Sequence, residues 1–204
     1  MGSILKRPID LTLAGLGLIL LAPVFAAVAL AILLVMGRPV LFRQVRPGYR
    51  ARPFTLYKFR SMQGACGASG VPRPDAERLT GLGRFLRDWS LDELPQLWNV
   101  LRGDMSLVGP RPLLMPYLSL YTPEQARRHE VRPGITGWAQ VNGRNSIGWE
   151  EKSGYDIWYV DHQSPWLDMK ILMLTVVRVI RRDGISEPST ETMMPSRGSA
   201  GGDP

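Results

Sequence analysis

The longest apolar stretch of the chain covers residues 11–36, where no charged side chain occurs and Thr12 is the only evident polar one. About 20 apolar residues suffice to span a bilayer, whereas the apolar part of a signal peptide has only about 7 to 15. The run therefore favours membrane association over a signal peptide. Pro23 lies near its middle, and a proline inside a helix removes a backbone hydrogen bond.

Basic residues flank this stretch on both sides, with Lys6 and Arg7 before it and several arginines after Gly37. Because positive charge marks the cytoplasmic side of a membrane segment, both flanks favour the same face. Two geometries stay open on the residues alone. The segment could span the membrane as a helix, or it could enter, bend at Ala22-Pro23 and leave by the same face.

After Gly37 the pattern changes to an alternation of apolar and polar residues in VLFRQV and FTLYKFRSM, on either side of Pro47-Gly48. This period of two predicts a β-hairpin. Lys58 and Arg60, two positions apart, would project from one face of its second strand. They could form a solvated face or, beside a phosphate site, could bind the anion.

Two helices are expected next, in LTGLGRFLRDW (79–89) and LPQLWNVL (94–101). The first would bring Arg84 and Arg87 near Asp92, as an ion-pair cluster or as phosphate ligands. Pro95 is tolerated only in a first helical turn, so the second helix should begin close to Asp92 and end at Gly103.

Asp92 and Glu93 at this helix start have two interpretations. Asp92 could be the N-cap, or Ser90 and Glu93 could form a capping box. A carboxylate held at the positive end of a helix can also serve as a nucleophile or as a ligand for a hard cation. The local pattern does not choose between them.

The last third of the chain contains a loop, VRPGITGWAQVNGRN, a cluster of Trp and Tyr residues, and a helix expected to start at Ser164-Pro165. Asp168 and Thr175 would lie on a polar stripe of that otherwise apolar helix. Residues 186–204 are rich in Ser, Gly and Pro, which predicts a disordered tail. The fold class expected from these elements is α+β and mainly helical.

The charge balance supports anionic partners. The chain has 25 Lys and Arg against 18 Asp and Glu, a formal net charge of +7, and nearly all the excess is arginine. Arginine forks suit phosphates, and a basic surface also suits anionic lipid. The single cysteine excludes a disulfide within the chain, and two histidines without further cysteines argue against a zinc site. A metal would therefore be oxygen-ligated, and Mg²⁺ is the ion expected. No GxxxxGK[ST] loop or GxGxxG fingerprint is present.

Four strings, KRPID, YKFRSM, SLDELPQLWNVLRGDMSLVGPRPL and VRPGITGWAQVNGRN, resemble the bacterial sugar transferases. The similarity is to the small monotopic polyprenyl-phosphate phosphoglycosyltransferases and covers about residues 4–186. It implies a re-entrant, Pro-bent helix in a membrane region of residues 1–37. It also implies a catalytic domain of residues 38–185, with amphipathic surface helices, on the cytoplasmic face of the bacterial inner membrane.

The resemblance further implies a ping-pong reaction that carries a phosphosugar from a UDP-sugar to undecaprenyl phosphate and releases UMP. Asp92 would be the nucleophile and a ligand of Mg²⁺, and Glu93 would assist proton handling or the attack of the carrier. The anion-binding positions of the family correspond to Lys58, Arg87, Arg111 and Arg144, and Asp156 matches a further acidic position. The family commonly has Ser-Pro at the bend, where this chain has Ala22-Pro23.

Other functions stay open on the residues alone. A membrane-spanning transferase could use other lipid or nucleotide substrates. A basic, membrane-tethered module could bind anions or lipid without catalysis, with Asp92 and Glu93 only capping their helix, and a scaffold for glycan assembly would show no turnover. Nucleic acid is not expected as a partner, and the sequence specifies neither the sugar nor the oligomeric state.

Overall fold

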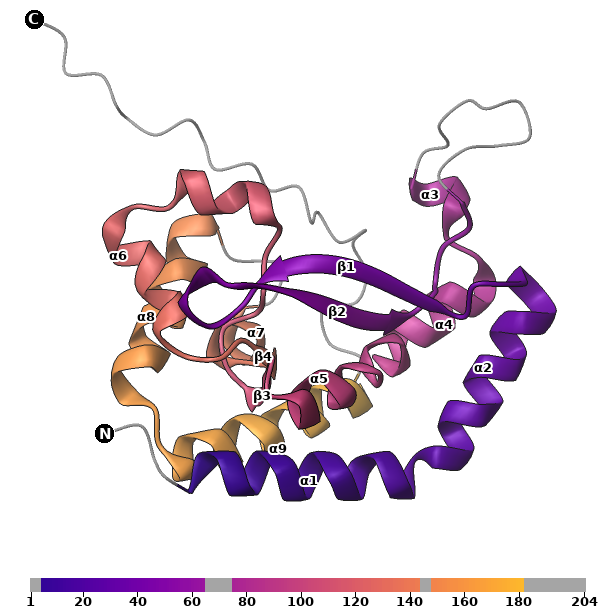
Figure 1. Ribbon diagram of the computed structural model, residues 1–204, viewed down its shortest axis with the longest axis horizontal. Helices are drawn as coiled ribbons and strands as arrows, with labels where there is room; N and C mark the ends of the chain where they lie inside the picture. Colours follow the sequence, from indigo (N-terminus) through magenta and orange to yellow (C-terminus); the bar gives the residue numbers. More distant parts are fainter. Residues whose placement is uncertain (1–4, 65–74, 144–147, 182–204) are drawn as a thin grey trace, which may run out of the picture.

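The computed structural model describes residues 5–64, 75–143 and 148–181 and is mostly helical, as expected. Two small sheets accompany the helices, an antiparallel β1–β2 hairpin and a parallel β3–β4 pair (Figure 1). The described elements are, in chain order, α1 Lys6–Leu20, α2 Ala22–Met36, β1 Leu41–Pro47, η1 Tyr49–Ala51, β2 Pro53–Phe59, α3 Asp75–Arg78, α4 Gly81–Asp88, η2 Leu91–Glu93, α5 Gln96–Arg102, β3 Ser106–Val108, η3 Met115–Leu120, α6 Pro123–Ala126, η4 Arg127–Glu130, β4 Gly134–Thr136, α7 Trp138–Asn142, α8 Trp149–His162 and α9 Pro165–Arg181.

The apolar run forms two helices, α1 and α2, that meet at a bend of 60° around Leu21. Pro23 lies in the first turn of α2, where its missing N–H is best tolerated. Within the described residues, neither helix alone is long and apolar enough to cross a bilayer, and the bent pair meets that standard only when both halves are counted together. The bend predicted at Ala22-Pro23 is therefore present, while its insertion into a membrane stays a prediction.

Both N-terminal helices pack against the rest of the protein along one side only. Ala14 of α1 lies in the main core, and Ile32 of α2 is buried in a second core with Phe59 and Leu86. The opposite sides of these helices expose large apolar side chains, among them Ile19, Leu20 and Leu34 at 72%, 74% and 78%. In Figure 1, α1 runs along the lower edge of the molecule and α2 rises from the bend.

The hairpin agrees with the predicted alternation. Its strands pair from Leu41 opposite Phe59 to Pro47 opposite Pro53. Its tip is tight, because Arg50 and Ala51 both have positive φ, 54° and 58°, in a region that glycine normally occupies. The hairpin runs above α5 in the view of Figure 1. The Asn99 side chain joins the two elements by accepting from Tyr57 N at 3.1 Å and donating to Thr55 O at 2.7 Å.

Lys58 and Arg60 do not act together, although their spacing suggested one shared face. Arg60 follows the last residue of β2 and donates to the backbone carbonyls of Gly37 at 2.6 Å, Arg38 at 3.0 Å and Met36. These carbonyls stand at the end of α2, where the helix leaves acceptors unpaired. Arg60 thus secures the exit of α2, and only Lys58 faces the acidic pair.

The helix after Asp92 begins later than predicted. Leu91–Glu93 forms a 3₁₀ turn, and α5 starts at Gln96 with Pro95 as its N-cap. Neither the N-cap role of Asp92 nor the Ser90–Glu93 capping box is present, because Ser90 is left-handed (φ 53°) and begins the tighter turn without a side-chain cap. The predicted stop at Gly103 is correct: its φ is 90°, which suits glycine.

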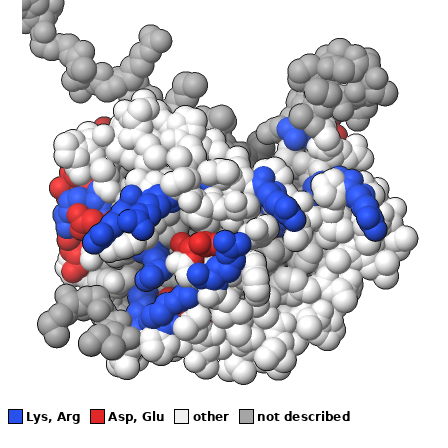
Figure 2. Space-filling model, in the orientation of Figure 1, with Lys and Arg blue, Asp and Glu red and all other residues white. Residues whose placement is uncertain are grey.

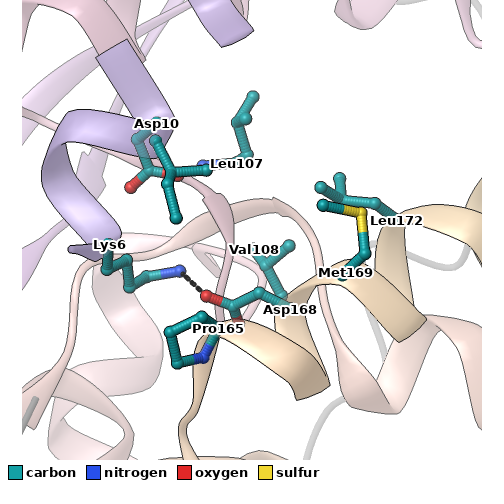
Figure 3. Close-up of a pocket in the computed structure, with 9 residues that line it drawn as sticks. Lys6, Asp10, Leu107, Val108, Pro165, Asp168, Met169 and Leu172 are labelled. Atoms are coloured by element: carbon teal, nitrogen blue, oxygen red, sulfur yellow. Dashed lines mark hydrogen bonds and ion pairs between the residues drawn. The ribbon is translucent and has the colours of Figure 1, made fainter. Parts of the chain in front are cut away.

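The start of α9 at Pro165 is also as predicted, with Ser164 Oγ accepting from Leu167 N at 3.2 Å. Nearby, Asp168 accepts from Lys6 Nζ and from Tyr159 Oη, each at 2.6 Å, and Asp10 accepts from Ser106 Oγ at 2.7 Å. We call Lys6, Asp10, Tyr159 and Asp168 the N-terminal lock, because they tie α1 to β3, α8 and α9. A cavity of about 30 Å³ beside it has room for about one water (Figure 3).

Candidate active site

The acidic pair, Asp92 and Glu93, lies on the 3₁₀ turn between α4 and α5. Hydrogen bonds from Glu93 N to Ser90 O and from Leu94 N to Leu91 O close this turn. Because a 3₁₀ turn has three residues per turn, consecutive side chains point about 120° apart. The two carboxylates can therefore have different environments although they are adjacent in the chain.

Glu93 is the carboxylate that meets the basic residues. Its Oε1 atom accepts from Arg111 Nη2 at 2.6 Å and from Lys58 Nζ at 3.1 Å. Burial alone would raise the pKa of Glu93, but Arg111 and Lys58 outweigh it and hold the pKa below its usual range. Glu93 is thus ionised across the physiological range and fixes the positions of two cations from β2 and from the loop after β3.

Asp92 is buried and differently surrounded. Among the described residues, no hydrogen bond or ion pair holds its carboxylate, although Lys58, Arg87 and Arg111 are close enough to act on it electrostatically. Burial and the negative charge of Glu93 raise the pKa of Asp92 to about 6, against the opposing effect of the three cations. At neutral pH the group is mostly ionised and available to attack an electrophile.

The third cation, Arg87, comes from the last turn of α4, and Ser61 Oγ accepts from its Nε at 2.9 Å. Its neighbour Arg84 is exposed, and it is not among the charges that act most strongly on either carboxylate. Of the two arginines that the sequence placed near the acidic pair, Arg87 is the one with a marked electrostatic effect on Asp92. We call Asp92, Glu93, Lys58, Arg87 and Arg111 the charge cluster.

Asp156, predicted as a binding residue, is attached to Arg128 rather than directly to the charge cluster. The two side chains form an ion pair of 2.7 Å, and each is only 4% exposed. Arg128 in turn donates to the backbone carbonyl of Arg111 at 2.9 Å. Asp156 thus reaches the cluster through Arg128, and its contact with a substrate stays a prediction.

Lys152 is a further cation that sequence patterns did not single out. It lies one helical turn before Asp156 on α8, and burial together with the nearby charge of Arg111 lowers its pKa. Arg144, the remaining predicted anion-binding residue, lies outside the described residues, as do Cys66 and the tail 186–204.

The basic excess of the composition is also visible on the surface. Figure 2 shows Lys and Arg side chains gathered across the face that carries the hairpin, with few acidic side chains between them. Exposed arginines include Arg43 and Arg52 from the hairpin and Arg102 at the end of α5. An anionic substrate would therefore approach a predominantly positive protein.

Comparison with known proteins identifies the family. The chain matches the family described as bacterial sugar transferase over residues 1–182. The chain belongs to the bacterial sugar transferase family. It is 56% identical over 190 residues to the uncharacterized sugar transferase EpsL of Bacillus subtilis (strain 168), covering 93% of this chain and 94% of that protein.

Longer relatives match as well. The UDP-glucose:undecaprenyl-phosphate glucose-1-phosphate transferase of Escherichia coli (strain K12) is 43% identical over 86% of this chain, which corresponds to 40% of that protein. The undecaprenyl-phosphate galactose phosphotransferase of Salmonella typhimurium is 39% identical over 72% of this chain and 35% of its own length. This sugar transferase therefore spans less than half the length of those two relatives.

The side chains of the charge cluster provide only some of the oxygen ligands that a hard cation such as Mg²⁺ needs. Asp92 offers carboxylate oxygens, but the described residues contain no group of three or more Asp, Glu, His or Cys side chains that could hold a metal by themselves. Mg²⁺ is commonly bound by one or two carboxylates together with substrate phosphates and water. Asp92 could contribute one carboxylate to a magnesium ion that arrives with a phosphorylated substrate, and this role stays a prediction.

Besides Lys152, two residues of this sugar transferase that help to build the site were missed from the sequence, Asn99 and Arg128. Asn99 is fully buried and bonds the backbone of β2 next to Lys58. Arg128 follows another arginine, Arg127, in a run that looks like a solvated face. Nothing in the local pattern separates the buried Arg128 from the partly exposed Arg127.

Proposed function

We propose that this protein transfers a sugar 1-phosphate from a UDP-sugar to undecaprenyl phosphate. The single observation that carries the proposal is the charge cluster, in which a buried carboxylate without a bonding partner among the described residues stands beside three cations. Binding of a diphosphate requires nearby positive charge, and a reaction through a covalent enzyme intermediate requires an available nucleophile such as this carboxylate. Family membership and the names of the relatives agree with this chemistry.

In the proposed first step, a carboxylate oxygen of Asp92 attacks the phosphorus that carries the sugar. A new O–P bond forms, the bond to the bridging diphosphate oxygen breaks, and UMP leaves with that electron pair. In the second step, a phosphate oxygen of undecaprenyl phosphate attacks the same phosphorus. The Asp92 carboxylate is thereby released, and the product is an undecaprenyl-diphosphate sugar.

The other members of the charge cluster stabilise negative charge on the substrate or hold the cations in position. Arg111, Arg87 and Lys58 would stabilise the negative charge that develops on the phosphoryl oxygens, and Glu93 holds Lys58 and Arg111 toward it. Mg²⁺ bound through Asp92 would supply further neutralisation of phosphate charge. Because Arg111 and Lys58 hold the pKa of Glu93 low, we assign Glu93 to positioning of these cations rather than to proton transfer in the substrate-free protein.

We also propose that the bent pair α1–α2 enters the cytoplasmic leaflet of the bacterial cell membrane and returns to the same face. Both halves expose large apolar side chains, and α9 adds Trp166, Met173 and Ile180 at 81%, 64% and 67%. An active site at the membrane surface suits a carrier lipid. A reporter fused at Met1 tests this topology: a periplasmic N-terminus with a cytoplasmic catalytic domain would rule out the re-entrant form.

The reaction is tested by UMP release from a panel of UDP-sugars with Mg²⁺, with and without undecaprenyl phosphate. Wild type should form a phosphosugar adduct, visible in the intact mass, and turn over only with the carrier. Asp92→Asn should lose the adduct and reduce turnover at least about 10³-fold. Asp161→Asn, which alters a surface carboxylate paired with Arg127, is the matched control and should retain both. Unchanged turnover in Asp92→Asn would exclude the covalent route.

A further inference from the structure

Arg128 of η4 is buried, and its bonds end on three different segments. It forms the ion pair with Asp156 of α8 at 2.7 Å, and it donates to Arg111 O at 2.9 Å and to Tyr121 Oη at 3.0 Å. Its guanidinium also lies over the Tyr121 ring, 5.5 Å from the centroid, and that ring stacks on Trp149. Arg128 is thus a junction between α8, the segment before α6 and the loop that carries Arg111.

This arrangement uses properties that only arginine has. The guanidinium presents five N–H donors in a fixed plane, so it can satisfy several acceptors in different directions at once. A buried ion pair is by itself weak evidence for stability, because apolar residues of similar volume often serve as well. The ion pair with Asp156 alone therefore does not explain a buried arginine here. The further hydrogen bonds of Arg128, to Arg111 O and Tyr121 Oη, need a separate explanation.

The bond from Arg128 acts on the loop that delivers Arg111 to the charge cluster. Pro110 and Pro112 flank Arg111 and restrict its backbone. The carbonyl of Arg111 is fixed by Arg128, and that of Pro112 accepts from Arg46 Nη1 at 3.2 Å. With its main chain held at these two points, Arg111 places Nη2 at 2.6 Å from Glu93.

We propose that Arg128, anchored by Asp156, is a positioning residue that fixes the main chain of Arg111 so that its guanidinium meets the diphosphate of the donor. The inference rests on the proposed function. Asp156 acts through Arg128 and does not touch the substrate. A shift of the Arg111 backbone by about 1 Å would be enough to reduce the rate about 10²-fold.

The main test replaces the pair by apolar residues of similar volume, Arg128→Met with Asp156→Leu. This double variant removes the bond to Arg111 and takes away both charges of the buried ion pair together, so we expect it to fold. We expect kcat/KM for the UDP-sugar to fall about 10- to 100-fold, with a thermal midpoint close to that of wild type. Arg128→Lys, which keeps a cation on Asp156 but lacks the fork, should fold and show a similar loss.

The matched control is Arg127→Met. Arg127 is the preceding residue on η4 and also carries several ion pairs, to Glu124, Glu130 and Asp161, but it lies at the surface and has no bond to Arg111. Its kcat/KM should equal that of wild type. Equal losses from Arg127→Met and from the Arg128 variants would mean that general disturbance of η4 explains the effect, and would overturn the proposal.

A double-mutant cycle separates positioning from a merely structural role. If Arg128 acts through Arg111, the pair replacement should add nothing to the loss caused by Arg111→Met. Independent, additive losses would overturn the proposal, as would wild-type kcat/KM in a folded Arg128→Met/Asp156→Leu protein.

A binding measurement tests the role of Arg128 even if the proposed transfer reaction is not observed. If wild type releases no UMP from any UDP-sugar, the proposed function fails, and binding of inorganic pyrophosphate is then measured by calorimetry on the same proteins. Weaker binding in the pair replacement but not in Arg127→Met would still support positioning of Arg111. Equal binding in all three proteins would overturn it.

Discussion

The charge cluster and the N-terminal lock are built from the same types of residue, yet they are arranged differently. In the lock, Asp168 accepts from Lys6, as Figure 3 shows, and also from Tyr159. Asp10 accepts from Ser106 Oγ and from Leu107 N, so each carboxylate has two donors. In the cluster, Glu93 alone takes two cations, and Asp92 has no bonding partner among the described residues.

This difference separates scaffold from reactive centre. A carboxylate whose oxygens are satisfied stabilises the fold and is poorly available as a nucleophile. A buried carboxylate beside another carboxylate is instead destabilised in its charged form and is available to react. Basic and acidic side chains that lie close together do not by themselves indicate an active site. What distinguishes the two regions is whether the carboxylate oxygens already have hydrogen-bond donors.

The largest expected effect is on stability: replacing a carboxylate of the lock should lower the free energy of unfolding, whereas replacing Asp92 of the cluster should raise it. Asp168→Asn leaves Lys6 without its counter-charge, and the free energy of unfolding should fall by about 3 kcal/mol. Asp92→Asn removes a carboxylate whose pKa is raised to about 6, so the free energy of unfolding should rise, on the order of 1–3 kcal/mol at neutral pH. Thermal and denaturant unfolding in EDTA measure both.

Two outcomes would remove the distinction between the regions. A loss of stability in Asp92→Asn comparable to that in Asp168→Asn would mean that Asp92 is a structural carboxylate as well. Full stability in Asp168→Asn would mean that the lock does not contribute to the fold. Asp161→Asn, at the surface, should change neither value appreciably and is the reference for both.

The effect expected from His129 is confined to acid pH; this residue belongs to neither region and provides a baseline for acid unfolding. Burial, with the nearby charge of Arg128, lowers the pKa of His129 to about 4. The unfolded chain binds a proton near pH 6.5 and the folded protein does not, so stability should fall as the pH drops from about 6.5 toward 4.

His129→Asn is the variant that isolates this contribution. The Asn amide can keep the donor that His129 Nδ1 supplies to Gly48 O, at 3.2 Å in the native protein, but it does not titrate. The slope of unfolding free energy between pH 6.5 and 4 should therefore be smaller in the variant. An unchanged slope would assign the acid sensitivity to groups other than His129.

The smallest effect concerns the hairpin tip, which touches neither carboxylate pair. Ala51 has a φ of 58°, a conformation that costs a non-glycine residue about 1–2 kcal/mol. Ala51→Gly should therefore raise the free energy of unfolding by about 1 kcal/mol, less than the full strain because glycine also has more freedom in the unfolded chain. Turnover should not change, and a loss of turnover would show that the tip takes part in substrate binding.

Several elements of the fold followed from short sequence patterns. The alternation in residues 40–62 predicted the hairpin, Ser164-Pro165 predicted the start of α9, and Gly103 marked the end of α5. Lys58, Arg87 and Arg111 were placed by resemblance, and the structure brings all three to the acidic pair. The start of α5 was predicted too early, because Pro95 is compatible both with the first turn of a helix and with the residue before it.

What the sequence by itself determined is the set of local elements and the presence of an acidic pair among arginines. Hydrophobic periodicity, glycine and proline act over a few residues, so they can be recognised without the rest of the chain. Only the tertiary structure decided which carboxylate meets the cations, that Arg60 binds carbonyl groups, and that Asp156 reaches Arg111 through Arg128. Those outcomes depend on contacts between segments far apart in the chain. Two residues with the same charge look equivalent in the sequence, and they differ only once folding gives each one its partners.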